Sequence, residues 1–175
     1  MKYDIAIEQL SEKEFLVIRG YVTWCQLTSD NISQWEQRFG SPNKDLIDQL
    51  KIMSGSNDVY YLFCNTCVQD DVFDWVCSDD IACENINKII ADENFDIVYL
   101  APSEYCKITY YYGGEMTPEQ AAKEADDYFW EDWLKNNPYK SKIEDDLMNA
   151  PETADITFYD SKNNCTITWH PVERV

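Results

Sequence analysis

The sequence predicts an α+β protein made of two β-α-β-β units that pack about a pseudo-twofold axis. Strand and helix patterns follow in the order strand, helix, strand, strand from about 13 to 90, and this order recurs from about 95 to 172. With 175 residues, 45% of them hydrophobic, the chain suits a single domain (1–175) with halves of about 1–92 and 93–175. We expect an antiparallel curved sheet with helices on one face and a cleft between the halves.

The first half begins with an apolar strand, "FLVIRGYVTW" (15–24), and continues with two helical segments. "NISQWEQRF" has apolar residues at helical spacing, and "SPNKDLIDQLKIMSG" repeats that spacing before a stop at Gly55. "DVYYLFCNTC" and "DDVFDWVCSDD" then predict two paired strands, because aromatic and β-branched residues are frequent in both.

The second half opens with "FDIVYLAPSEYCKITYYYGG", a strand-rich segment interrupted at Pro102. Thr117-Pro-Glu-Gln120 is typical of a helix start, with a capping threonine, a proline at the first helical position and a glutamine that completes a capping box. The helix should end before Pro138, and its apolar stripe, Ala122, Ala125, Phe129 and Trp133, should pack against the sheet. Residues 156–159 and 165–169 predict a closing hairpin.

The charge balance excludes some function classes. A net charge of −19 argues against direct binding of nucleic acid, since phosphates are held by clustered lysine and arginine. An acidic surface favours cationic ligands or basic partner proteins instead. No run of 18 or more apolar residues occurs, and the N-terminus lacks the pattern of a secretion signal, so we expect a cytoplasmic protein with no membrane segment.

The cysteines and the one histidine do not predict a metal, a cofactor or a catalytic site. The seven cysteines are an odd number for a disulfide scaffold, so we expect buried, reduced thiols. Cys64 and Cys67 form a C-x-x-C pair, but no second ligand pair follows, and His170 is isolated in the sequence. No serine or cysteine nucleophile signature accompanies His170, so the sequence favours a binding protein over an enzyme.

Several motifs together resemble one bacterial family. "YFWEDWLKNNPYKS", "DITFYD" and "CTITWHPV" are similar to the end of the GyrI-like, or AraC-type, effector-binding domains, and "SEKEFLVIRG", "ISQWEQRF" and "APSEYCKITYYYGG" match the same family in order. The resemblance covers nearly the whole chain. It implies a domain that binds lipophilic, frequently cationic compounds between its two units, often within a multidrug-responsive transcription regulator that also carries a DNA-binding module. The chain has no room for that module, so we expect a stand-alone member that acts through a separate protein or whose output is not transcription.

The resemblance also bears on one residue of the pocket. The family commonly presents a glutamate two residues before the tyrosine of the penultimate strand. That tyrosine matches Tyr159, so Thr157 stands where the acid would be. A hydroxyl can hydrogen-bond but carries no charge, so cation selectivity and hydrolysis through this position are both in doubt. Asp74, Glu84 and Glu104 are candidates for a substitute acid from another strand.

Alternation along the penultimate strand places Thr157 and Tyr159 on one face and Ile156 and Phe158 on the other. We expect helices to cover the second face, which leaves the first toward the cleft. Rigid aromatic side chains suit flat or lipophilic ligands by stacking and cations by attraction to the ring face. The predicted ligand-binding residues are Tyr60, Trp75, Tyr111, Trp133, Thr157, Tyr159 and Trp169.

Three functions stay open on the sequence alone. The leading hypothesis is an effector-binding domain that senses or sequesters a lipophilic or aromatic small molecule, in transcription regulation or in drug and toxin sequestration. The first alternative is an acidic protein-interaction module of the gyrase-inhibitor kind. Salt would weaken its binding to a basic partner. The second alternative is a small hydrolase of electrophilic compounds, whose turnover would be lost on changing Tyr159 or a nearby acid.

Overall fold

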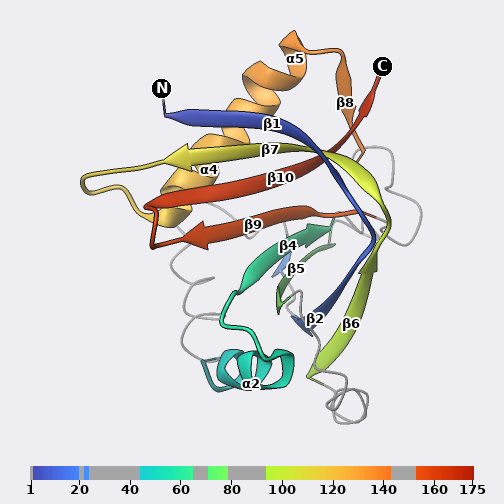
Figure 1. The fold of residues 1–175 in the computed structure, drawn as a ribbon, viewed down its shortest axis with the longest axis vertical. Helices are drawn as coiled ribbons and strands as arrows, with labels where there is room; N and C mark the ends of the chain where they lie inside the picture. The colour runs from blue at the N-terminus through green and yellow to red at the C-terminus, as the bar shows by residue number, and fades with distance from the viewer. Residues whose placement is uncertain (1, 20–21, 24–43, 65–70, 79–93, 143–152) are drawn as a thin grey trace.

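The structure is a computed structural model, and it describes residues 2–19, 22–23, 44–64, 71–78, 94–142 and 153–175 (Figure 1). The helix expected at "NISQWEQRF" lies outside the described residues, as do Cys25, Cys67, Cys83 and Glu84. In the described part of the chain, no helix is both long and apolar enough to span a membrane.

Strands and a few helices alternate along the chain. The elements are β1 (Tyr3–Leu10), β2 (Lys13–Arg19), β3 (Val22–Thr23), α2 (Lys44–Ser54), β4 (Tyr60–Cys64), β5 (Asp71–Ser78), β6 (Phe95–Leu100), β7 (Ser103–Tyr111), α4 (Pro118–Tyr128), the π-helical turn η3 (Phe129–Trp133), α5 (Leu134–Asn136), β8 (Tyr139–Ser141), β9 (Asp155–Asp160) and β10 (Cys165–Arg174). All strand pairings among them are antiparallel. The predicted α+β class with an antiparallel sheet is therefore confirmed, while β1 and β8 were not predicted.

The sheet is strongly curved because its two ends are linked by nearly continuous strands. Strand β1 continues into β2, and β6 continues into β7. The strand order is β1-β7-β10-β9-β4-β5-β2-β6. Only two residues separate β1 from β2, and only two separate β6 from β7. The pairings β1–β7 and β2–β6 also share one unbroken register, from Tyr3 opposite Tyr110 to Ile18 opposite Phe95. These four strands form one bent ribbon that ties the two ends of the order together, so the sheet must curl (Figure 1).

The inside of the curl is a hydrophobic core. It gathers buried residues from strands at both ends of the order: Phe15, Val17, Leu62, Leu100, Tyr105, Ala154 and Ile156. Burial of each large apolar side chain contributes roughly 1.5–3 kcal/mol relative to exposure. This side of the sheet is called the inner face below.

Helices α2 and α4 both pack on the opposite, outer face. Leu50 of α2 packs with Leu16 and Ile18 of β2. The second helix packs against β7 and β10 through Ala121, Ala125, Phe129 and Trp133. The buried alanine at the start of this stripe is Ala121 rather than the predicted Ala122, which is only part buried.

The local signals of the sequence formed the elements they predicted. The Thr117 hydroxyl accepts a hydrogen bond from the backbone N–H of Gln120, whose side chain accepts one from the N–H of Thr117. Gly55 follows α2 with φ +74°, a left-handed conformation that glycine adopts without a steric cost. In the turn of the β9–β10 hairpin, Asp160 accepts backbone hydrogen bonds from Lys162 and Asn163.

One expectation about the faces is wrong. Thr157 of β9 lies opposite both Tyr61 of β4 and Thr168 of β10, so these three residues share a face. Tyr61 packs against the α2 core, and that face is the outer one. The helices therefore cover the face of Thr157 and Tyr159, while Ile156 belongs to the inner core. Alternation fixes which residues share a face, but the packing of distant strands decides which face the helices take.

Candidate ligand-binding site

The outer face carries an aromatic and hydroxyl group at the meeting of β4 and β9. Tyr61 and Thr157 are direct partners across these strands. The rings of Tyr61 and Tyr159 are 5.1 Å apart between centroids, with an interplanar angle of 44°. All three side chains are part buried. We call Tyr61, Thr157 and Tyr159 the junction site, since β4 comes from the first half of the chain and β9 from the second.

An acidic side chain of α4 acts on the junction site. Burial raises the pKa of Tyr61, and the carboxylate of Glu119 raises it further. Glu119 is the second residue of α4. The first turn of this helix is held on β10 by the Thr166 hydroxyl, which donates to the carbonyl oxygen of Pro118 at 2.9 Å. Sequence reasoning missed Glu119, because a first-turn acid is common in helices and is usually explained by the helix dipole.

The acids proposed from the sequence do not supply this charge in the described structure. Glu104 is part buried on β7, opposite Gln9 and Val172. The side chain of Asp74 and the whole of Glu84 lie outside the described residues.

A buried hydroxyl lies next to the junction site. Thr168 is the β10 partner of Thr157, it is 3% exposed, and its Oγ1 has no hydrogen-bond partner among the described residues. A buried polar group without a partner costs about 1–3 kcal/mol. The Thr168 hydroxyl is therefore a buried polar group beside the junction site, not one exposed to a bound molecule.

Tyr60 and Trp169 lie on the inner face instead. Their ring centroids are 6.5 Å apart, and both pack against the inner core. The indole Nε1 of Trp169 donates to Glu8 at 3.3 Å, and Glu8 also binds the Lys107 ammonium at 3.1 Å. That ammonium lies 5.6 Å from the centre of the Trp169 ring. The ammonium of the protein's own Lys107 thus already contacts the Trp169 ring.

The other predicted residues belong neither to the junction site nor to the Tyr60–Trp169 pair. Trp133 is buried in the outer core, with its ring stacked 5.7 Å from that of Phe129. Tyr111 is 45% exposed at the end of β7, and a hydrogen bond with Asp4 raises its pKa. The backbone of Trp75 pairs with that of Leu62, and its side chain lies outside the described part. Of the predicted set, the structure brings together Thr157 with Tyr159, and Tyr60 with Trp169.

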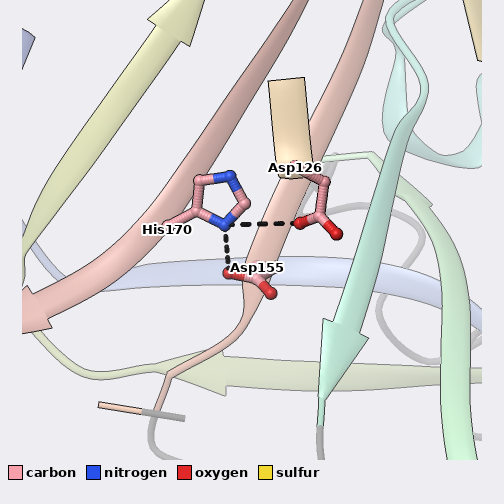
Figure 2. A group of neighbouring side chains, drawn as sticks. All are labelled: Asp126, Asp155 and His170. Carbon is pink, nitrogen blue, oxygen red and sulfur yellow. Dashed lines mark hydrogen bonds and ion pairs between the residues drawn. The ribbon is translucent and has the colours of Figure 1, made fainter. Parts of the chain in front are cut away.

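His170 is not isolated in the fold. Its Nδ1 lies 3.0 Å from Oδ1 of Asp155 and 3.9 Å from Oδ1 of Asp126, as Figure 2 shows. The imidazole is stacked on the ring of Phe129, with centroids 4.0 Å apart and an interplanar angle of 7°. Asp126, Asp155 and His170 come from α4, β9 and β10, and no spacing in the sequence links them.

The environment of this cluster is partly desolvated. Burial raises the pKa of Asp126 to about 6; the charge of His170 lowers it, and the charge of Asp155 raises it. The side chains of two cysteines are also described. Cys106 and Cys165 are free and buried, and burial raises the pKa of Cys106 to about 12, so the prediction of buried, reduced thiols is confirmed for these two.

Comparison with known proteins gives structural likeness alone. Neither a protein-family model nor a curated protein matches the sequence. The structure of SAV2435 bound to tetraphenylphosphonium matches with a TM-score of 0.67 and 13% identity, over 97% of this chain and 94% of that one. A putative bacterial transcription regulation protein from Staphylococcus aureus MU50 matches with a TM-score of 0.62 and 15% identity, over 97% and 98%. EcmrR, in a complex with DNA, matches with a TM-score of 0.62 and 13% identity, over 100% of this chain and 59% of that one.

The chain shares the fold of these solved structures, and this fold is consistent with the GyrI-like effector-binding domains that the motifs resemble. The family resemblance seen in the motifs is confirmed at the level of the fold, and it extends along almost the whole chain. At such low identity the GyrI-like fold places the strands and helices but not the ligand-contacting side chains, which must be argued from the residues of this chain.

Proposed function

We propose that the protein is an effector-binding domain that binds a lipophilic or aromatic small molecule at the junction site. The observation that carries this proposal is the contact of two part-buried tyrosine rings, Tyr61 and Tyr159, beside Thr157 at the meeting of β4 and β9. Such rings offer flat apolar surface together with hydroxyl groups. Support comes from SAV2435, which shares this fold and was solved with tetraphenylphosphonium, a lipophilic cation.

The strand order supports a duplicated unit, which would explain why a site forms here. Suppose that β1, β2, β4 and β5 are exchanged, in that order, with β6, β7, β9 and β10. The strand order of the sheet is then the same as before, read from the opposite end. In that exchange β4 and β9 replace each other at the centre, and α2 and α4 occupy equivalent places. We infer that the junction site lies on a pseudo-twofold axis, in a cleft between two equivalent helices on the outer face.

Charge favours a cationic ligand at this site. Glu119 supplies a carboxylate near Tyr61, in place of the acid that Thr157 lacks. The net charge of −19 also raises the local concentration of cations around the whole protein. The role that suits such a site is sensing or sequestration of the compound. EcmrR, of which this fold makes up only part and which was solved on DNA, supports a role in regulation.

Titration calorimetry with tetraphenylphosphonium chloride tests the proposal. The variants are Tyr61→Ala and Tyr159→Ala, and the matched control is Tyr99→Ala, since Tyr99 is a 51% exposed tyrosine of β6 that bonds Glu12. Loss of one aromatic contact of about 0.5–1.5 kcal/mol should weaken binding roughly 2- to 12-fold. The control should bind like the wild type.

Three results would overturn the proposal. One is an affinity for tetraphenylphosphonium that neither junction variant changes. The other is the absence of binding by tetraphenylphosphonium and by neutral aromatic probes of similar size. A loss of binding in Trp169→Phe but not in Tyr159→Ala would place the ligand on the inner face and also contradict the junction site.

A further inference from the structure

The cluster of Asp126, Asp155 and His170 has the composition and spacing of a metal site. Each residue offers one ligand atom, and the three atoms lie within 4.8 Å of one another (Figure 2). We propose that these residues bind a divalent metal ion, Mn²⁺ or Zn²⁺. This proposal does not depend on the proposed ligand at the junction site.

The distances suit a small metal ion. Nitrogen and oxygen ligands lie about 2.0–2.2 Å from such ions, so neighbouring ligand atoms are roughly 3–3.5 Å apart. The separation between Nδ1 of His170 and Oδ1 of Asp155 is already 3.0 Å. The corresponding distance to Asp126 is 3.9 Å, and the three ligand atoms lie within 4.8 Å of one another. The Asp126 side chain must therefore move by somewhat more than 1 Å, which a change of carboxylate rotamer can supply.

The burial of the three residues differs in a useful way. The His170 side chain is 2% exposed, that of Asp155 is 15% exposed, and that of Asp126 is 49% exposed. Stacking on Phe129 holds the imidazole so that its Nδ1 points at both carboxylates. Two ligands are thus fixed in place, while the third stands at the surface, where an ion can enter and keep water in its remaining positions.

The charges of the cluster are not balanced. Among the described residues, neither Asp126 nor Asp155 forms an ion pair with lysine or arginine, and their shared partner is His170. Two carboxylates face a single imidazole, so the cluster carries an excess of negative charge in a partly desolvated place. A divalent cation would remove that excess, and burial would strengthen its attraction to the carboxylates.

The second nitrogen of His170 sets the expected strength of the site. Nε2 is buried and has no hydrogen-bond partner in the part of the chain that the structure describes. When Nδ1 binds a metal, the proton moves to Nε2, and most metal sites provide an acceptor for it. Lack of that second partner typically costs about 10- to 100-fold in affinity. We therefore expect the affinity for the metal to be lower by this factor than at a site where the second nitrogen has an acceptor. The ion should exchange readily and be lost to a chelator.

The nitrogen and oxygen donors of the cluster determine which metal ion should be tested first. Imidazole suits Zn²⁺, and carboxylates suit Mn²⁺. The seven cysteines can also take up Zn²⁺, whereas Mn²⁺ has little affinity for thiolates. Mn²⁺ is therefore the first probe.

The experiment uses the full chain after treatment with EDTA. Electron paramagnetic resonance of free Mn²⁺ counts bound ions, and thermal unfolding with MnCl₂ or ZnCl₂ measures stabilisation. Asp126→Asn removes one ligand from a half-exposed position, so the fold should be retained. Asp127→Asn is the matched control, because Asp127 is the next residue of α4 and pairs with Lys123 outside the cluster. Wild type and control should bind one Mn²⁺ per chain and gain the same rise in Tm, and Asp126→Asn should lose at least 10-fold in affinity.

Two outcomes would overturn the metal site. The first is the absence of Mn²⁺ and Zn²⁺ binding by the wild type. The second is equal Mn²⁺ binding by wild type and Asp126→Asn. If circular dichroism shows that Asp126→Asn is misfolded, Asp155→Asn serves as the second variant, and unchanged binding there also excludes the site.

Discussion

Tyr61 of β4 and Thr157 of β9 are direct partners in the strand pair that joins the two halves of the chain, on the face that α2 and α4 share. A change at Thr157 therefore acts on the centre of the junction site. The hydroxyl of Thr157 carries no charge, and its neighbours Tyr61 and Thr168 add only hydroxyl groups.

Thr157→Glu should increase the affinity for tetraphenylphosphonium and leave that for neutral aromatic probes unchanged. A carboxylate within a few ångströms of a bound cation in a partly exposed place contributes roughly 1–2 kcal/mol, or about 5- to 30-fold in affinity. Titration calorimetry at physiological salt measures the effect. Ser161→Glu adds the same charge in the exposed hairpin turn and serves as the control. An equal gain in both variants would show that only the net charge matters.

Glu119→Gln should have the opposite effect. Removing the carboxylate near Tyr61 should weaken tetraphenylphosphonium binding about 3- to 10-fold, with no effect on a neutral probe. The same change should lower the pKa of Tyr61, because the Glu119 charge raises it. The control is Glu115→Gln, which removes an exposed acid ahead of α4. Unchanged cation affinity in Glu119→Gln would mean that this acid does not serve the site.

The parts of the fold that the sequence predicted well depend on local chemistry. The capping box at Thr117, the stop at Gly55 and the turn after Asp160 each act within a few residues, so a single sequence is sufficient to find them. Strand β1 was missed because it is an edge strand whose residues are mostly exposed, so its sequence has no clear strand pattern. Its pairing with β7 holds it in the strand conformation.

The candidate site was only partly predictable for a related reason. Alternation correctly grouped Thr157 with Tyr159, but the helix-bearing face depends on the packing of Leu16 and Ile18 against α2, far away in the sequence. The cluster around His170 likewise needs three elements to meet. No local pattern shows that Asp126 of α4 will stand beside strands β9 and β10.

Tyr110→Phe should destabilise the protein and change its response to alkali. The buried Tyr110 hydroxyl donates to the carboxylate of Glu124, a bond worth about 1–2 kcal/mol at neutral pH. This bond, with burial, raises the pKa of Tyr110 from its ordinary value of about 10 to about 12. Because the folded pKa is the higher one, this contribution to stability is complete below pH 10 and declines as the pH rises from about 10 to about 12.

Urea unfolding at pH 8 and at pH 10.5 measures both effects. Wild type should lose more of its free energy of unfolding between these values than Tyr110→Phe does. Tyr139→Phe removes a hydroxyl from another tyrosine that packs on the same outer core and is the control. A pH dependence in Tyr110→Phe as steep as that of the wild type would show that Tyr110 does not titrate as proposed.

Thr117→Ala should destabilise the fold through the start of α4. The alanine removes the acceptor for the Gln120 N–H and breaks the capping box, at a cost of about 0.5–2 kcal/mol. Thr117→Asn keeps an acceptor at the cap and should recover most of the loss. Because the first turn of α4 carries Glu119, the alanine variant should also bind tetraphenylphosphonium less tightly, whereas the asparagine variant should not. A loss of stability without a loss of affinity would mean that the position of Glu119 does not depend on the cap, and would separate the folding of this helix from its role at the junction site.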